Sequence, residues 1–299
     1  MFSFTLIVMD KNQDPIIFEA YKPLRNAIRK LGLADSLAVI RAYMSNLQFD
    51  QDIPSDCEVH RDYLAFTSHS ERSRWISEFH LETLCREVIL NGIEAGLPEK
   101  TLRSWKTLGR TIKHLEEVIA GRYSGPDLFI QELHRMAHRQ FPWQKFRPTA
   151  VNITRYHMIY GHPPLTRIVQ TATGLSPDEL FLFGMALLDV FTDTFAQVYP
   201  PNIQIPGLSS DGLDRFLSHF SRSLPDLKVL LRDEHQMNDG FGYAYHSLRA
   251  YPLIRMKYQG GECLVCPIPT LLFWRFTSGV YYEIFNQPGF ENAFGEAFQ

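Results

Sequence analysis

The sequence predicts a mainly α-helical fold, a multi-helical globular body with one β-hairpin late in the chain. Apolar residues recur at helical spacing through most of the 299 residues. Phe2–Val8 would form a short strand or a buried start, and the clear strand-like alternation follows residue 250. Apolar residues make up 45% of the chain and charged residues 21%, which is typical of a protein with a large core. We expect helical subdomains over residues 1–125 and 126–240, then a hairpin with further helices over 241–299.

The first 120 residues contain the strongest helical patterns. Apolar spacing from Ile16 to Leu47 predicts two helices that break near Gly32, and a further helix is predicted over Arg74–Ala95. The clearest helix is predicted over Pro98–Ala120. Its apolar residues, from Leu97 onwards, share one arc, and the opposite arc carries Lys100, Arg103, Lys106, Arg110 and Lys113.

Later helices are indicated by their end signals. Ser176 can cap a helix, with proline in the first turn and Glu179 completing a capping box. This start predicts an apolar, central helix over Leu180–Val198. Another helix is predicted over Leu213–Leu231, with a break at Pro225.

The hairpin is predicted from alternation around a turn. Residues Leu253–Tyr258 alternate, Gly260 and Gly261 favour a turn, and Cys263–Ile268 form the returning strand. Helical character resumes over Pro269–Phe285. Phe290 then begins an apolar repeat of four-residue spacing. A docked terminal helix or continuation into another domain would each explain this repeat.

Charge is distributed unevenly, although the net charge is only −3. No Asp or Glu occurs from Leu133 to Pro177, where cations alternate with aromatic residues. A local positive field attracts polyanions, and exposed aromatic rings can stack on unpaired bases. We therefore predict contact with DNA or RNA through the five cations of Pro98–Ala120, with Arg135, Arg139 and Arg147 as second candidates. Solvated helix faces and buried core aromatics are the alternatives.

No complete catalytic motif is present, so we predict no catalytic residue, no metal and no cofactor. There is no phosphate-binding loop, nucleophile elbow or dinucleotide fingerprint. His134 and His138 lack a third metal ligand, and the pair Cys263 and Cys266 lacks the second pair of a zinc ribbon. Arg74 and His80 have a spacing similar to that in helical ribonucleases, but such a spacing is common by chance.

The sequence also predicts where the protein resides. No apolar run approaches the roughly 20 residues that span a bilayer. The first nine residues lack the basic leader and cleavage site of a signal peptide. We therefore expect a cytoplasmic protein without a membrane partner.

The last 50 residues resemble a known bacterial pattern. Its residues are Tyr251–Ile254, the hairpin through Pro269, the segment Leu271–Tyr282 and the stretch Phe294–Phe298. They resemble the helical N-terminal region of proteins, several of them in anti-phage defence, that carry a downstream restriction-endonuclease-like domain of the PD-(D/E)xK type. The acids and lysine of such a nuclease would lie beyond Gln299, so the resemblance implies no catalytic residue here.

Together these features predict a non-catalytic recognition or regulatory region of a defence-type nuclease. It would contact nucleic acid, or a trigger derived from a phage, through its basic face. The alternative is a helical scaffold that binds a partner protein and no nucleic acid. Steep loss of nucleic-acid binding with salt would distinguish the first from the second.

Overall fold

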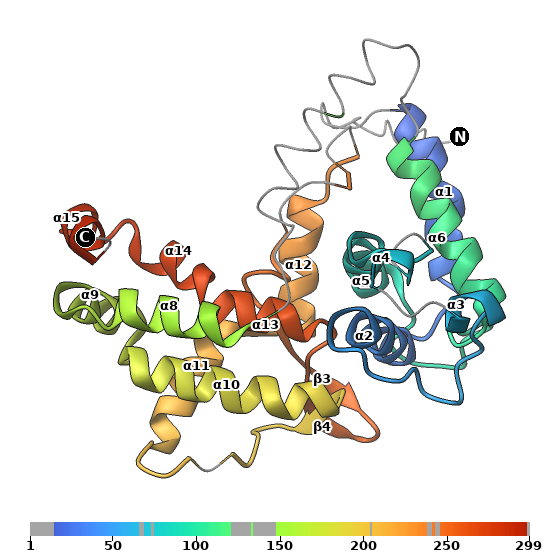
Figure 1. Cartoon of the computed structure of the whole chain (residues 1–299). Coiled ribbons are helices and arrows are strands. Elements are labelled where there is room, and N and C mark those ends of the chain that lie inside the picture. Colours follow the sequence, from blue (N-terminus) through green and yellow to red (C-terminus); the bar gives the residue numbers. More distant parts are fainter. Residues whose placement is uncertain are drawn as a thin grey trace, which may run out of the picture.

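The computed structural model places helices around a small sheet (Figure 1), which confirms the predicted mainly α fold. It describes residues 15–65, 69–72, 75–120, 133, 148–203, 205–237, 241–242 and 246–297. Other segments, including residues 121–132 and 134–147, lie outside the described residues.

Among the described residues, six helices belong to the N-terminal part of the chain. They are α1 (Pro15–Ile28), α2 (Leu33–Phe49), α3 (Arg61–Ala65), α4 (His69–Arg72), α5 (Glu78–Asn91) and α6 (Trp105–Ala120). The break between α1 and α2 at Gly32 matches the prediction. The helix predicted from Arg74 begins later because Ser77 caps α5, its side chain accepting a hydrogen bond from the His80 backbone N–H.

The start of α6 differs from the sequence prediction. The helix begins at Trp105, so Lys100 and Arg103 precede it. The Lys100 backbone N–H donates to the carbonyl of Lys30 at 3.0 Å, a tertiary contact that competes with helix formation. Leu97, predicted on the apolar arc, is 96% exposed.

The second half of the chain contributes further helices and the four strands that the described residues form. They are α8 (Ala150–Tyr160), α9 (Pro163–Thr173), α10 (Pro177–Asp193), β1 (Ala196–Val198), α11 (Ser210–Phe220), β2 (Ser221–Ser223), α12 (Leu224–Glu234), β3 (Leu253–Tyr258), β4 (Gly261–Val265), α13 (Pro269–Phe276), a 3₁₀ turn (Ser278–Val280), α14 (Tyr281–Ile284) and α15 (Phe290–Ala297). The capping box at Ser176 is confirmed, with both reciprocal hydrogen bonds formed. Several boundaries differ, and the helix predicted over Pro269–Phe285 is interrupted by the 3₁₀ turn. The helix predicted to Val198 ends at Asp193, and the break predicted at Pro225 occurs at strand β2.

The predicted hairpin is confirmed and forms the centre of a larger sheet, although its returning strand is Gly261–Val265 and not Cys263–Ile268. Strands β3 and β4 pair antiparallel, with Ile254 opposite Val265, and Gln259 and Gly260 make the turn with positive φ angles of 49° and 86°. The strand order is β1-β4-β3-β2, with β1 antiparallel to β4 and β2 parallel to β3.

At the end of the hairpin distant from its turn, both faces are buried, each against a different apolar core. Ile254 and Val265 point into a first core built with α1, α2, α5, α6 and α12. Leu253 and Leu264 point the other way, into a second core built with α8–α11 and α13–α15. Alternation along each strand therefore serves two cores at the end distant from the turn, whereas Lys257 and Glu262 near the turn are exposed.

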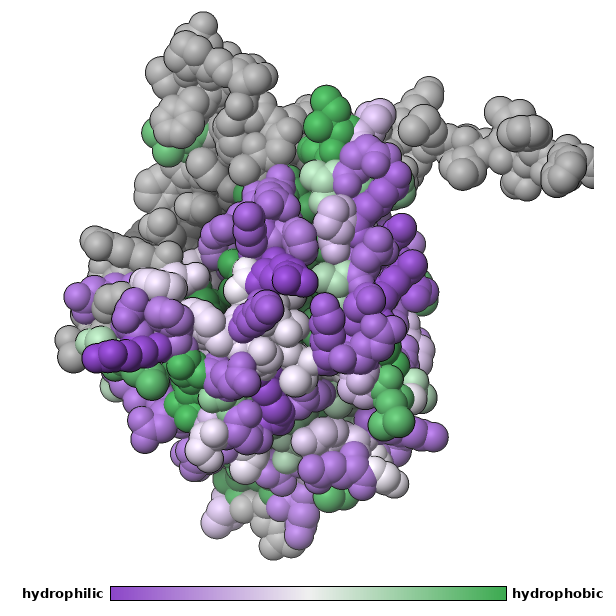
Figure 2. All heavy atoms as spheres, turned by 90° about the vertical axis from the view of Figure 1, so that its right-hand side faces the viewer, coloured by the Kyte–Doolittle hydropathy of each residue, from purple (hydrophilic) through white to green (hydrophobic). Residues whose placement is uncertain are grey.

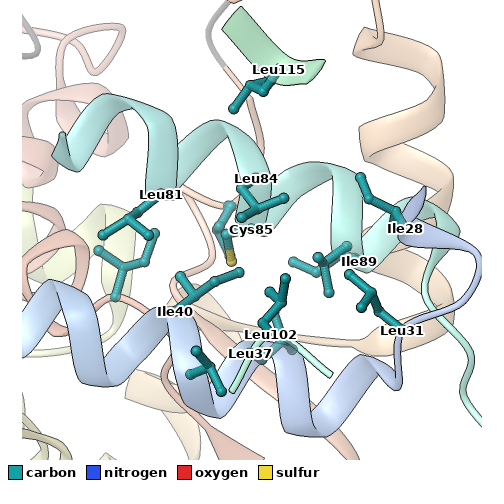
Figure 3. Close-up of a cluster of buried hydrophobic side chains, with 14 of the residues drawn as sticks. Ile28, Leu31, Leu37, Ile40, Leu81, Leu84, Cys85, Ile89, Leu102 and Leu115 are labelled. Carbon is teal, nitrogen blue, oxygen red and sulfur yellow. The ribbon is translucent and has the colours of Figure 1, made fainter. Parts of the chain in front are cut away.

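The first core is centred on the packing of α2 against α5. Figure 3 shows Leu37 and Ile40 of α2 directed toward Leu84, Cys85 and Ile89 of α5. All of these side chains are buried. Helix α5 is buried around its whole circumference, so its charged residues require partners within the protein.

The second core includes the C-terminal helix α15. Phe290 is buried there, its ring lies 5.4 Å from that of Tyr281, and Phe294 packs against the same core. The apolar repeat noted in the sequence is therefore a packed face as far as Ala297.

Glycine substitutions test the packing of the second core. A Cβ at Gly184 in α10 would lie 2.5 Å from Cγ of the buried Phe276, so we expect Gly184→Ala to destabilise the protein by about 1–3 kcal/mol. The control, Gly109→Ala in α6, meets nothing within 4 Å and should stabilise by roughly 0.5–1 kcal/mol. Urea midpoints of the two variants measure the difference, and equal midpoints would contradict the packing described.

Candidate nucleic-acid interface and buried ionic network

Three of the predicted cations form a stripe on α6. Lys106, Arg110 and Lys113 are spaced four and three residues apart, which places them on one side of the helix. All three are exposed, and their direction is opposite to that of the buried Leu108 and Leu115. Within the described part of the chain, none of the three forms an ion pair. We call these three residues the α6 stripe.

Lys100 and Arg103 occupy a different environment. Arg103 donates from Nε to Asp35 at 2.6 Å and also pairs with Asp56, so its charge is neutralised by acids from α2 and the following loop. Lys100 is exposed but belongs to the extended segment before α6. The structure therefore does not bring the five predicted cations together on one helix face. Arg103 instead links the segment before α6 to α2 and the loop after it.

The second-candidate cations lie in a part of the chain that the structure does not describe. Arg135, Arg139 and Arg147 lie outside the described residues, as do His134, His138 and Arg74. From the same acid-free segment, Arg155 and Arg167 are described, and both are exposed.

The surface around the α6 stripe is hydrophilic. Helix α1 packs beside α6 (Figure 1), and Figure 2, which views this side of the molecule, shows mainly hydrophilic residues along it. Arg29, which follows α1, is exposed. Two acids near the end of α6 face histidines: Glu116 approaches His80 at 3.8 Å, and Glu117 approaches His114 at 3.1 Å.

A buried ionic network on α5 was not foreseen from the sequence. Glu87 is fully buried and accepts hydrogen bonds from the Tyr21 hydroxyl at 2.8 Å and from Arg86 Nε at 2.8 Å. The His235 ring Nε2 lies 2.9 Å from the same carboxylate. The Arg86 guanidinium also lies over the ring of Phe241, 4.8 Å from its centroid.

Glu82, one turn earlier on α5, is the second centre of this network. Arg249 holds its carboxylate with two hydrogen bonds, of 2.6 and 2.8 Å, in the bidentate geometry that binds carboxylates most strongly. His246 Nε2 lies 3.1 Å from the same group. These partners tie α5 to the segment that leads into β3.

The electrostatics of both glutamates fit a structural role. Burial alone would raise the pKa of Glu82, but Arg249 and His246 outweigh it and hold the pKa at about 2. Burial is likewise outweighed at Glu87, where Arg86, His235 and Tyr21 hold the pKa at about 2. A carboxylate with so low a pKa is a poor proton acceptor at neutral pH, so neither group suits general-base catalysis.

The two cysteines of the Cys-x-x-Cys pair point to opposite faces of the sheet. Cys263 belongs to the first core and Cys266 to the second, and both are buried free thiols. Burial raises the pKa of Cys266 to about 12, which suppresses the reactive thiolate. The geometry therefore prevents the pair from sharing one metal or one disulfide. Among the described residues, no group of three potential ligands is placed to hold a metal.

Comparison with known proteins identifies no relative of this chain. No family model, no curated protein and no solved structure matches the chain. The resemblance of residues 250–299 to defence-nuclease proteins therefore stays a prediction. In the described part of the chain, no helix has the combination of length and apolar character that crossing a membrane requires.

The ionic network predicts a loss of stability in acid. Because the folded pKa values of Glu82 and Glu87 lie below the ordinary value of 4.5, their stabilising contribution is complete above pH 4.5 and declines as the pH falls toward 2. Urea midpoints should therefore fall across this range. Glu82→Gln should destabilise by about 3–5 kcal/mol at pH 7, because it removes the buried carboxylate that Arg249 binds with two hydrogen bonds.

The control for this prediction is Asp178→Asn. Asp178 forms an exposed pair with His157 at 2.7 Å, which should contribute less than about 1 kcal/mol. If Glu82→Gln had an effect no larger than Asp178→Asn, the network would not have the stabilising role assigned to it.

Proposed function

We propose that this chain binds nucleic acid without catalysis, through electrostatic docking on the α6 stripe. The observation that carries the proposal is the set of three exposed cations, Lys106, Arg110 and Lys113, without acidic partners among the described residues. Cations that neutralise phosphates release condensed counterions, which gives affinity without dependence on base sequence.

The dimensions of the stripe suit a phosphate backbone. Seven residues of α-helix rise about 10 Å, and phosphates follow one another at about 3.4 Å of axial rise along one strand of a duplex. The stripe can therefore lie along roughly three phosphates. Exposed Arg29 and Lys100, on neighbouring segments, could add contacts at the edges of this surface.

Within the described residues, the absence of acidic partners distinguishes these cations from several other cations of the chain. Arg103 and Arg249 are each committed to carboxylates, and Lys228 pairs with Glu94. Cations that are already paired would have to break a native contact before binding a phosphate. The α6 stripe needs no such rearrangement.

A second function is favoured by a different surface. Val151 and Met158, seven residues apart on α8, are 65% and 70% exposed and lie on one face of the helix. Exposed apolar side chains in one row are typical of a helix that binds a partner protein. This scaffold function would require no nucleic acid, and its binding would depend little on salt.

Docking of nucleic acid on the α6 stripe would serve to control a nuclease. If the resemblance at residues 250–299 is correct, binding at the α6 stripe would bring nucleic acid, or a phage-derived trigger, to a nuclease and control it. The binding proposal can be tested without that nuclease.

Charge reversal on the α6 stripe tests the proposal. The triple variant Lys106→Glu, Arg110→Glu and Lys113→Glu should abolish binding of labelled duplex DNA at low salt, because attraction becomes repulsion. For the unmodified protein, three phosphate contacts predict a loss of affinity of about 40-fold between 50 and 200 mM salt. Fluorescence anisotropy across a salt series measures both effects.

A matched variant separates the stripe from overall charge. Arg167→Glu, Arg232→Glu and Lys257→Glu change the net charge equally at three exposed cations on α9, α12 and β3. This control should retain most of the affinity. Equal losses in the two triple variants would reject the α6 stripe as the site, and absence of binding by the unmodified protein at low salt would favour the scaffold function.

A further inference from the structure

An aromatic cluster lies at the N-terminal end of α6, where the stripe begins. Trp105 is the first residue of α6, and its ring centroid lies 6.3 Å from that of Trp75 and 5.8 Å from that of His60. Tyr63 of α3 is 5.7 Å from Trp105, and Tyr43 of α2 is 6.4 Å away. Residues from four separate segments thus meet at this helix end.

The exposure of the rings increases from the core side of the cluster to the surface side. Tyr43 and Tyr63 are buried, Trp105 is partly buried, and Trp75 is 41% exposed. His60 stacks on Trp75, with centroids 5.4 Å apart and an interplanar angle of 26°. The outermost ring is therefore held in place by other rings, so little conformational freedom would be lost when a flat ligand stacks on it.

Charge around the cluster differs from charge along α6. We call the outer rings, His60 and Trp75, the rim of the cluster. Lys106 follows Trp105 directly, so the rim adjoins the α6 stripe. Exposed Glu58 and Asp62 lie near His60 in the chain, and Asp62 approaches the His60 ring at 3.7 Å. These acids disfavour a phosphate at the rim itself. An uncharged aromatic group is compatible with the rim, while phosphates are compatible with the helix.

We infer that the site takes single-stranded nucleic acid, with an unpaired base stacked on Trp75 and the adjoining phosphates on the α6 stripe. The inference rests on the proposed function and specifies its ligand. Stacking on an aromatic platform tolerates any base, since every base has a π-face. In a duplex the bases are already stacked within the helix, so Trp75 would contribute nothing to duplex binding.

The test compares Trp75→Ala with the unmodified protein on two probes, an oligo(dT) of roughly 12 nucleotides and a duplex of the same length. We expect the affinity for oligo(dT) to fall by about 5- to 150-fold, the range of one lost stacking contact, with the affinity for duplex unchanged. The salt dependence of oligo(dT) binding should stay the same, because no phosphate contact is removed. Trp75→Phe, which keeps a ring, should retain most of the affinity.

The control is Tyr282→Ala, which removes an aromatic ring of 67% exposure from α14. It should leave both affinities unchanged. If Trp75→Ala bound oligo(dT) as well as the unmodified protein, or lost duplex binding equally, the stacking site would be overturned even though charge reversal on α6 still abolished binding. If the unmodified protein bound neither probe at low salt, the proposed function would fail together with the inference.

Discussion

The structure depends on a small sheet that must be covered on both faces. Strands β3 and β4 present apolar side chains alternately to each side, with Ile254 and Val265 on one and Leu253 and Leu264 on the other. Leaving either face in water would expose apolar surface at about 25 cal/mol per Å². Helices therefore pack on both faces, and the hairpin contributes side chains to both cores.

The charged residues of the neighbouring helices α5 and α6 differ in burial and pairing. Helix α5 is enclosed, and each of its buried glutamates is paired with an arginine and a histidine. Arg86 is adjacent to Glu87 on α5, whereas His235, His246 and Arg249 come from distant segments. Helix α6 buries one face and leaves its cations outside. Buried charge without a partner is far more costly than exposed charge, so the pairs on α5 maintain the fold while the cations on α6 are available to a ligand.

Local signals in the sequence were sufficient for much of the fold. The break at Gly32, the capping box at Ser176 and the turn at Gly260 depend on residues a few positions apart, and all three were predicted. Strands β1 and β2 were missed because each has only three residues and forms by pairing with the hairpin. Neither strand has an alternating pattern long enough to recognise.

The candidate site was less predictable because its chemistry depends on distant partners. The helical periodicity that selected Arg103 contains no information about Asp35, which neutralises it from another helix. The contact of Glu87 with Tyr21 and His235 spans most of the chain, so only the tertiary fold reveals it. One signal was available: charged residues within the apolar α5 pattern imply internal partners.

The position of α12 in the chain has a consequence for synthesis. Its residues Leu224, Leu227 and Leu231 are buried in the first core, and the preceding buried member of that core along the described chain is Val118. Between them, only the partly buried Ile119, Phe195 and Ala196 among the described residues pack against this core. At roughly 5–20 residues per second, the ribosome needs roughly 5–20 s to make the intervening segment. Until then the nascent α1, α2 and α5 lack part of their apolar cover. Chaperone demand during translation should therefore be greatest before α12 and the hairpin emerge.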